Sequence, residues 1–169
     1  ILRHESPDPD AIGSQVGLRE IIRATYPEKT VYLLGEMPSS LTYIGEMDEI
    51  TQEQFDAALI IVLDCANTPR IDCPFEVDPS KVIKIDHHPD RDVYGAISFV
   101  DTNSSSTSEI LCRFAFDVES TWKVSKEAAN ALYAGIVGDT GRFLYPATTA
   151  VTFAMVSKLL EFDVDISGI

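Results

Sequence analysis

Short apolar runs alternate with segments of helical periodicity along most of this chain. The runs fit buried strands at residues 30–34, 57–63, 81–85 and 96–100, and helices are predicted at residues 11–25, 106–116, 125–137 and 149–162. Strands that alternate with helices favour an α/β fold, in which a mostly parallel β-sheet is flanked by helices on both faces. Residues 35–54 are predicted to be a loop with room for one short helix. No linker divides the chain, so a single domain over residues 1–169 is expected.

Three of the predicted helices have start signals. Ser106 and Glu109 have the spacing of a capping box, Ser125 precedes a run of good helix formers, and Thr148 or Thr149 can cap the last helix. These signals support the predicted helix starts.

All three histidines of the chain lie beside aspartates where apolar runs end. His4 follows the apolar start of the chain, Asp64 follows the second strand-like run, and Asp86-His87-His88 follows the third. Ligands of open α/β sheets bind beyond the carboxyl ends of the strands, so these side chains are expected at one edge. Asp139 ends an apolar helical segment, where neighbouring glycines allow close approach.

The number of ligands decides between one metal ion and two. Six side chains qualify as ligands: His4, Asp8, Asp10, Asp64, His87 and Asp139. They are too many for one catalytic ion that keeps an open position, whereas two ions about 3.5–4 Å apart with a bridging carboxylate use them well. Asp64 is the expected bridge, and two prolines stiffen the loop that carries Asp8 and Asp10. Mixed imidazole and carboxylate ligands favour Mn²⁺, with Mg²⁺, Co²⁺ and Zn²⁺ as alternatives.

The composition excludes several classes of function. A formal net charge of −14 argues against binding of long duplex nucleic acid, which depends on Lys and Arg neutralising phosphates. No apolar run approaches the roughly 18 residues of a membrane span, and no basic signal region is present, so a soluble cytoplasmic protein is expected. Cys65, Cys73 and Cys112 lack C-x-x-C spacing and are predicted to be reduced thiols. The chain has neither a Gly-x-x-x-x-Gly-Lys loop nor a Gly-x-Ser-x-Gly elbow, which argues against an ATPase and a serine hydrolase.

Four stretches together resemble a known family. In chain order they are His4-Glu5-Ser6-Pro7-Asp8-Pro9-Asp10, Leu63-Asp64, Asp86-His87-His88 and Gly138-Asp139-Thr140-Gly141-Arg142-Phe143. The chain resembles the DHH phosphoesterase superfamily and, more narrowly, the bacterial oligoribonuclease/pAp phosphatase group often called nanoRNase A. The resemblance implies a manganese-dependent hydrolase. Such an enzyme would cleave phosphate esters of short oligoribonucleotides or pAp with a water activated by two metal ions.

The resemblance also implies which residues bind the metals. One Mn²⁺ would be bound by His4, Asp8 and Asp64, and the second by Asp10, Asp64, His87 and Asp139. The shared carboxylate is again that of Asp64.

Three further positions acquire catalytic roles from the same resemblance. Asp86 would orient the histidines, and His88 would contact the phosphate or help protonate the leaving group. Arg142 would bind phosphate, with a salt bridge as the alternative. For residues 104–108 both donation to phosphate and helix capping stay open.

Members of the group usually carry a second, C-terminal domain that binds the far end of the substrate, and nothing after Phe162 resembles it. A truncated chain is therefore expected. Its partner would be a short oligoribonucleotide or a small phosphorylated nucleotide, and a homodimer is left open.

Other functions remain as alternatives. Cyclic dinucleotide phosphodiesterases, DHH-type inorganic pyrophosphatases and single-strand DNA exonucleases share the same metal-binding residues. A metal- or nucleotide-binding module without turnover would be expected to have lost a ligand, and none is missing.

Overall fold

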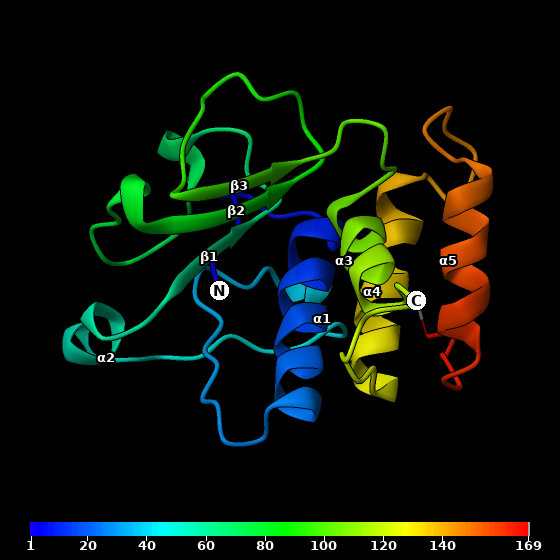
Figure 1. The fold of residues 1–169 in the computed structure, drawn as a ribbon, viewed down its shortest axis with the longest axis horizontal. Coiled ribbons are helices and arrows are strands. Elements are labelled where there is room, and N and C mark those ends of the chain that lie inside the picture. The colour runs from blue at the N-terminus through cyan, green and yellow to red at the C-terminus, as the bar shows by residue number, and fades with distance from the viewer. Residues whose placement is uncertain (169) are drawn as a thin grey trace.

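Three parallel strands form the sheet of this chain, whose computed structural model describes residues 1–168 (Figure 1). β1 (Ile60–Leu63) pairs with β2 (Val82–Asp86), and β2 pairs with β3 (Ile97–Val100). Leu2 lies beside β1 on its other side and forms an isolated parallel bridge with Val62. The first residues of the chain and all three strands therefore point toward the same edge of the sheet.

One of the predicted strands is wrong. Residues 30–34 form no strand, although Ile1 donates to the carbonyl of Tyr32 and accepts from the amide of Leu34. The backbone of Leu33 instead bonds to Asp48, whose side chain accepts from the Leu33 amide at 2.8 Å and whose own amide donates to the Leu33 carbonyl at 2.7 Å. Because a loop residue takes these backbone groups, no ladder continues there.

Four helices lie on one side of the sheet, two of them against it and two behind these, and a shorter helix lies on the other side (Figure 1). The four are α1 (Pro9–Thr25), α3 (Thr107–Ala115), α4 (Lys126–Asp139) and α5 (Ala150–Leu160). The shorter one is α2 (Gln52–Asp56). The α/β fold and the parallel sheet are confirmed, and loops share the second face with α2.

Two apolar clusters correspond to these two faces. Leu63 and Ile85 point toward the four-helix layer, where they pack with residues such as Ile110, Leu132 and Ile136. On the other face, a second cluster contains Phe55 of α2 together with Leu2, Val62, Val82 and Tyr94. Since β1 and β2 are mostly buried on both faces, these two strands read as mainly apolar runs in the sequence, whereas the edge strand β3 is largely exposed.

The predicted helix caps are confirmed, with one exception. Ser106, Ser125 and Thr149 each accept a hydrogen bond from an amide in the first turn of their helix. Glu109, however, does not complete a capping box with Ser106. Its side chain accepts instead from the hydroxyls of Ser105 and Thr152, both at 2.6 Å. The buried Glu109 therefore ties α3 to the start of α5.

Close approach of α1 and α4 depends on small residues. A Cβ atom at Gly13 would lie 2.4 Å from the carbonyl oxygen of Ala131, so only glycine fits there. A Cβ atom at Gly138 would lie 2.7 Å from Pro9. These contacts bring the start of α1 next to the end of α4, where Asp10 and Asp139 lie.

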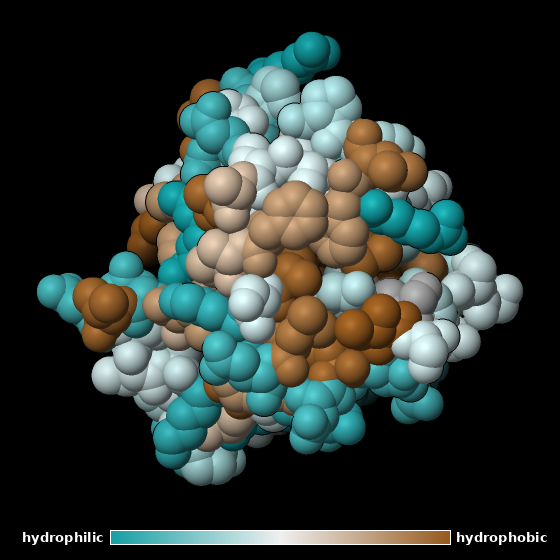
Figure 2. All heavy atoms as spheres, turned by 90° about the vertical axis from the view of Figure 1, so that its right-hand side faces the viewer, coloured by the Kyte–Doolittle hydropathy of each residue, from teal (hydrophilic) through white to brown (hydrophobic). Residues whose placement is uncertain are grey.

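The outer face of α5 is unusually apolar for an exposed helix. Figure 2 shows hydrophobic residues gathered near the middle of this side of the molecule. Val151 and Phe153 are 45% and 54% exposed, and Leu144 in the preceding loop is 83% exposed. Within residues 1–168, no helix combines the length and apolar character needed to cross a membrane. All three cysteines are free, as predicted.

Candidate metal centre

His4 is fixed in one orientation by the backbone around it. It forms an antiparallel bridge with Ile71, and its Nδ1 atom lies 2.7 Å from the carbonyl oxygen of Glu5. A carbonyl oxygen only accepts, so Nδ1 carries the hydrogen and Nε2 keeps its lone pair. Nε2 lies 3.5 Å from Asp64 Oδ2 and 3.8 Å from Asp8 Oδ2. The tautomer is thus the one that a metal ligand between these groups requires.

Asp64 is the centre of the cluster. It follows β1 and has a φ of 52°, a left-handed conformation that Asp and Asn tolerate better than most residues. All three histidines approach its carboxylate at 3.5 Å, through His4 Nε2, His87 Nε2 and His88 Nδ1. Its side chain is only 1% exposed. A carboxylate so placed can be shared between two metal ions.

Asp10 is held by the N-terminus of α3. Its Oδ2 atom accepts from the amide of Thr107 at 2.7 Å, and its Oδ1 atom accepts from the amide of Ser108 at 2.9 Å. The free N–H groups and the dipole of a helix N-terminus favour a negative charge at this place. Asp10 is therefore fully buried and fixed, while further lone pairs of its oxygens are left for a metal ion.

Asp139 and His87 meet at the end of α4. Asp139 is the last residue of the helix, as predicted, and its Oδ2 atom lies 3.1 Å from His87 Nε2. Despite this distance, His87 Nε2 has no hydrogen-bond partner of acceptable geometry. The nitrogen of His87 and the oxygen of Asp139 thus lie close together without a hydrogen bond between them. This arrangement is typical of two ligands of the same cation.

The structure brings all six predicted ligands together. They form two groups, in each of which the ligand atoms lie within 4.8 Å of one another: His4, Asp8 and Asp64, and Asp10, His87 and Asp139. A third group consists of Asp64, His87 and His88. Asp64 Oδ2 and His87 Nε2 are buried without hydrogen-bond partners, which leaves donor atoms for metal. The four aspartates carry four negative charges, which two divalent cations would balance.

The protonation behaviour of the cluster also fits cations. Burial lowers the pKa of His4, but the nearby carboxylates of Asp64 and Asp8 raise it to about 10. Burial likewise lowers the pKa of His87, and Asp139 with its neighbouring carboxylates raises it to about 10. Burial and the charges of Asp64 and Asp139 hold the pKa of Asp10 well above its usual range. The carboxylates thus attract positive charge, which bound metal ions would supply in place of protons.

Asp86 and His88 form a separate pair. Asp86 Oδ1 lies 2.8 Å from His88 Nδ1 and also accepts from the amide of His88 at 3.1 Å. The hydrogen bond with Asp86 raises the pKa of His88. Asp86 therefore orients His88, whereas no hydrogen bond joins Asp86 to His87 or His4 in the described part of the chain. The prediction that Asp86 orients the histidines holds for one of the three.

Arg142 lies on the loop just after Asp139. Its φ of 58° is left-handed, and its amide donates to the carbonyl of Val137 at 2.9 Å. The side chain is exposed and forms no ion pair with residues 1–168, which removes the salt-bridge alternative. The residue stays available for a phosphate.

Residues 104–108 serve the fold rather than an open phosphate site. Ser104 accepts from Arg113 at 2.8 Å, Ser105 donates to Glu109, and Ser106 caps α3. The first amides of α3 donate to Asp10. The structure supports the capping interpretation of this stretch.

Sequence reasoning missed three residues that build the site. Thr107 donates its hydroxyl to Asp64 Oδ1 at 3.1 Å, in addition to the amide bond to Asp10. Arg70 places Nη2 3.0 Å from His4 Nδ1. Lys84 is fully buried, with Nζ 2.9 Å from Asp90, 3.9 Å from Asp86 Oδ2 and 4.4 Å from the centre of the Tyr94 ring. Two of these residues could have been noticed in the sequence: Thr107 lies within the serine-rich residues 104–108, and Lys84 lies inside an apolar strand.

A parallel sheet whose carboxyl edge gathers histidines and aspartates defines a class of metal-binding α/β domains. The model of the DHH family, N-terminal domain, matches residues 1–136. This chain belongs to the DHH family.

Relatives of known name cover the whole chain. Over 169 residues it is 51% identical to the probable bifunctional oligoribonuclease and PAP phosphatase NrnA of Streptococcus mutans, and it covers 54% of that protein. Over 95% of this chain, it is 47% identical to the bifunctional oligoribonuclease and PAP phosphatase NrnA of Bacillus subtilis, 51% of which it covers. A solved exopolyphosphatase-related protein from Bacteroides fragilis matches with a TM-score of 0.77 and 27% identity, over 98% of this chain and 52% of that one. The chain spans about half the length of these relatives.

Proposed function

We propose that this chain supplies the metal-binding part of a phosphoesterase that hydrolyses short oligoribonucleotides and pAp. The observation that carries the proposal is the position of Asp64, with three histidines at 3.5 Å and further aspartates around it. The names of the two bacterial relatives supply the substrate class. The net charge of −14 fits a small substrate held by metal ions better than a long polyanion.

The proposed ligands fall into two sets. His4, Asp8 and Asp64 would hold one ion, and Asp10, Asp64, His87 and Asp139 would hold the other. Two bound divalent ions supply Lewis acidity, which activates a water and offsets charge on the phosphoryl oxygens. Mn²⁺ is the proposed ion, because imidazole and carboxylate ligands are mixed.

Two further residues would act on the phosphate group. The hydrogen bond with Asp86 raises the pKa of His88 and so favours its protonated form, from which His88 would donate a proton to the leaving oxygen. Arg142 would bind a phosphoryl oxygen, because it is an exposed residue three positions after Asp139 and no carboxylate pairs with it in residues 1–168. Both roles follow from the chemistry of the side chains and their place in the site.

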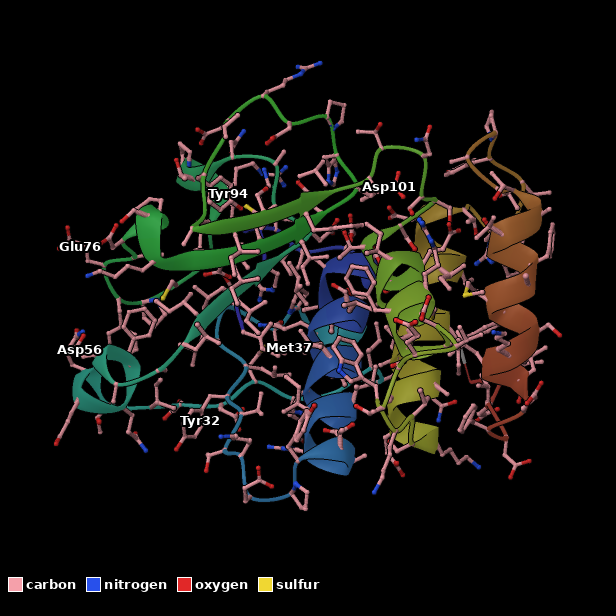
Figure 3. The ribbon with its side chains drawn as sticks, in the orientation of Figure 1. Tyr32, Met37, Asp56, Glu76, Tyr94 and Asp101 are labelled. Carbon is pink, nitrogen blue, oxygen red and sulfur yellow. The ribbon has the colours of Figure 1, made fainter. Side chains whose placement is uncertain are left out.

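The test is Mn²⁺-dependent release of mononucleotide from a 5′-phosphorylated RNA dinucleotide, with Asp64→Asn as the inactive variant. Asparagine tolerates the left-handed φ of position 64, so this change removes the charge without straining the backbone. Asp56→Asn is the matched control, because Asp56 is an exposed aspartate of α2, remote from Asp101 at the carboxyl edge of the sheet (Figure 3).

Activity that needs Mn²⁺, survives Asp56→Asn and disappears in Asp64→Asn supports the proposal. Bound Mn²⁺ without mononucleotide release contradicts it, and pyrophosphate and cyclic dinucleotides would then be tested as substrates. A second domain for the far end of the substrate, a homodimer and a cytoplasmic location stay predictions.

A further inference from the structure

Arg70 is a cation at the rim of the metal centre. It ends the 3₁₀ turn Thr68–Arg70, and its Nη2 atom lies 3.0 Å from His4 Nδ1 and 3.4 Å from the carbonyl oxygen of Glu5. Within residues 1–168 it forms no ion pair with an aspartate or glutamate. The chain has 27 acidic and only 13 basic residues, so most arginines could find a carboxylate partner. An arginine without one, at the rim of the metal centre, is therefore a candidate for binding an anion.

The backbone under Arg70 is firmly held. Its carbonyl accepts from the amide of Glu5 at 2.7 Å, and its amide donates to Asn67 at 3.2 Å. Next to it, Asp72 donates its amide to the carbonyl of Arg3 at 2.9 Å and forms an ion pair with the buried Arg3 side chain. The segment is therefore a rigid base, whereas the Arg70 side chain itself is only partly buried.

The contact with His4 leaves the guanidinium of Arg70 without a strong acceptor. Nδ1 of His4 already donates to Glu5 and has no lone pair left when Nε2 faces the metals. Two donors cannot form a hydrogen bond with each other, so the 3.0 Å approach is a contact between neighbours. Most of the five N–H groups of Arg70 are thus available to an anion.

The exposure of the site residues shows where a substrate enters. The side chain of Asp8 is 48% exposed and that of His88 is 36% exposed, while Asp64 is at 1%. Asp8 lies beside His4, and Arg70 contacts the same imidazole from its outer edge. The His4 ring separates the guanidinium from the metal-facing Nε2. A phosphate held by Arg70 on the far side of this ring can therefore be a group other than the phosphate at the metals.

We propose that Arg70 binds a second, non-reacting phosphate of the substrate, one ribose away from the phosphate that is hydrolysed. The inference rests on the proposed function and narrows its substrate class to nucleotides with two phosphates. A 5′-phosphorylated dinucleotide and pAp both meet this condition, and a planar guanidinium can hold such a phosphate with two hydrogen bonds.

The experiment compares Arg70→Gln with the parent protein in equilibrium binding and in turnover. Binding of adenosine 3′,5′-bisphosphate and adenosine 3′-monophosphate to the Mn²⁺-loaded protein is measured by calorimetry. A His88→Gln background slows hydrolysis, because it lacks the proposed proton donor and keeps all six proposed metal ligands. Arg70→Gln is expected to weaken binding of the bisphosphate about tenfold or more, as for lost hydrogen bonds to a charged group, and to leave the monophosphate within about twofold. In turnover, KM for a 5′-phosphorylated dinucleotide should rise, and KM for its 5′-hydroxyl analogue should not.

Arg23→Gln is the matched control, because Arg23 is an exposed arginine at the far end of α1 whose partner is Glu20. Arg70→Lys keeps the charge without the planar fork and should fall between the parent and Arg70→Gln. Thermal melts show whether each variant is folded.

Three results would overturn the inference. Equal losses for the bisphosphate and the monophosphate would show that Arg70 does not read the second phosphate, and unchanged binding of both would show that it binds none. Weaker Mn²⁺ binding in Arg70→Gln would show that the residue acts through His4. A parent protein that binds the bisphosphate selectively but hydrolyses neither dinucleotide would refute the proposed function and leave the role of Arg70 standing.

Discussion

At the scale of single residues, Thr107 is the support that the metal centre depends on most clearly. Its hydroxyl donates to Asp64 at 3.1 Å and its amide donates to Asp10 at 2.7 Å. Thr107→Val keeps the shape and the amide but removes the hydroxyl. We expect a loss of about 10- to 100-fold in Mn²⁺ affinity, the usual effect of removing a group that orients a metal ligand. Thr107→Ser should restore most of it, and calorimetric titration with Mn²⁺ would show either outcome.

Metal-free protein is expected to lose stability as the pH rises above about 6.5. Burial lowers the pKa of His4 and of His87, but their carboxylate neighbours raise both values to about 10. A group whose pKa is higher in the folded chain stabilises the fold fully below its unfolded pKa. That contribution is lost as the pH rises through the folded pKa.

Thermal melts in a chelator should therefore show a Tm that falls between pH 6.5 and 9. With Mn²⁺ the imidazoles bind metal in their neutral form, so the gain in Tm from the metal should widen with pH. A gain that shrinks over this range would contradict the assignment of His4 and His87 as ligands.

At the scale of the elements, the packing of α1, α3 and α4 is what places Asp10. A Cβ atom at Gly135 of α4 would lie 2.1 Å from Ser108 Oγ and 2.7 Å from Asp10 Oδ1. Alanine normally stabilises a helix relative to glycine, but here Gly135→Ala is expected to destabilise the chain by about 1–3 kcal/mol through overpacking. The free energy of unfolding in urea measures this loss. Adding Ser108→Ala should recover part of it, and two effects that simply add would contradict the contact.

The elements also show how far the sequence can predict this structure. Apolar runs predicted all three strands: β1 and β2 are mostly buried on both faces, and β3 is apolar in sequence although it is largely exposed at the edge of the sheet. Residues 30–34 have the same pattern yet form no strand, since Asp48 takes the backbone groups of Leu33. The pattern of apolar residues in a segment does not show which groups its backbone will hydrogen-bond with.

Some residues of the candidate site could be predicted from the sequence, and others could not. The convergence of the six candidate ligands could be predicted, because each lies at or next to the end of a strand or helix and these ends meet at one edge. The role of Thr107 could not, because it depends on α3 pointing its first amides at a residue 97 positions earlier in the chain. The position of Arg70 could not be predicted either. The backbone pairing of His4 with Ile71, two segments far apart in the sequence, is what brings Arg70 to the site.

At the scale of the whole molecule, the net charge of −14 should oppose binding of long RNA. Ordinary nucleic-acid-binding proteins lose affinity as salt rises, because cationic contacts release counterions. This chain has few such contacts to lose, and salt mainly screens the repulsion between its acidic surface and a polyanion. Long single-stranded RNA should therefore inhibit dinucleotide binding weakly, and more strongly at about 200 mM salt than at about 50 mM. Competition binding at both salt concentrations measures the slope. The opposite slope would show that a basic surface, and not the metal centre alone, recognises the substrate.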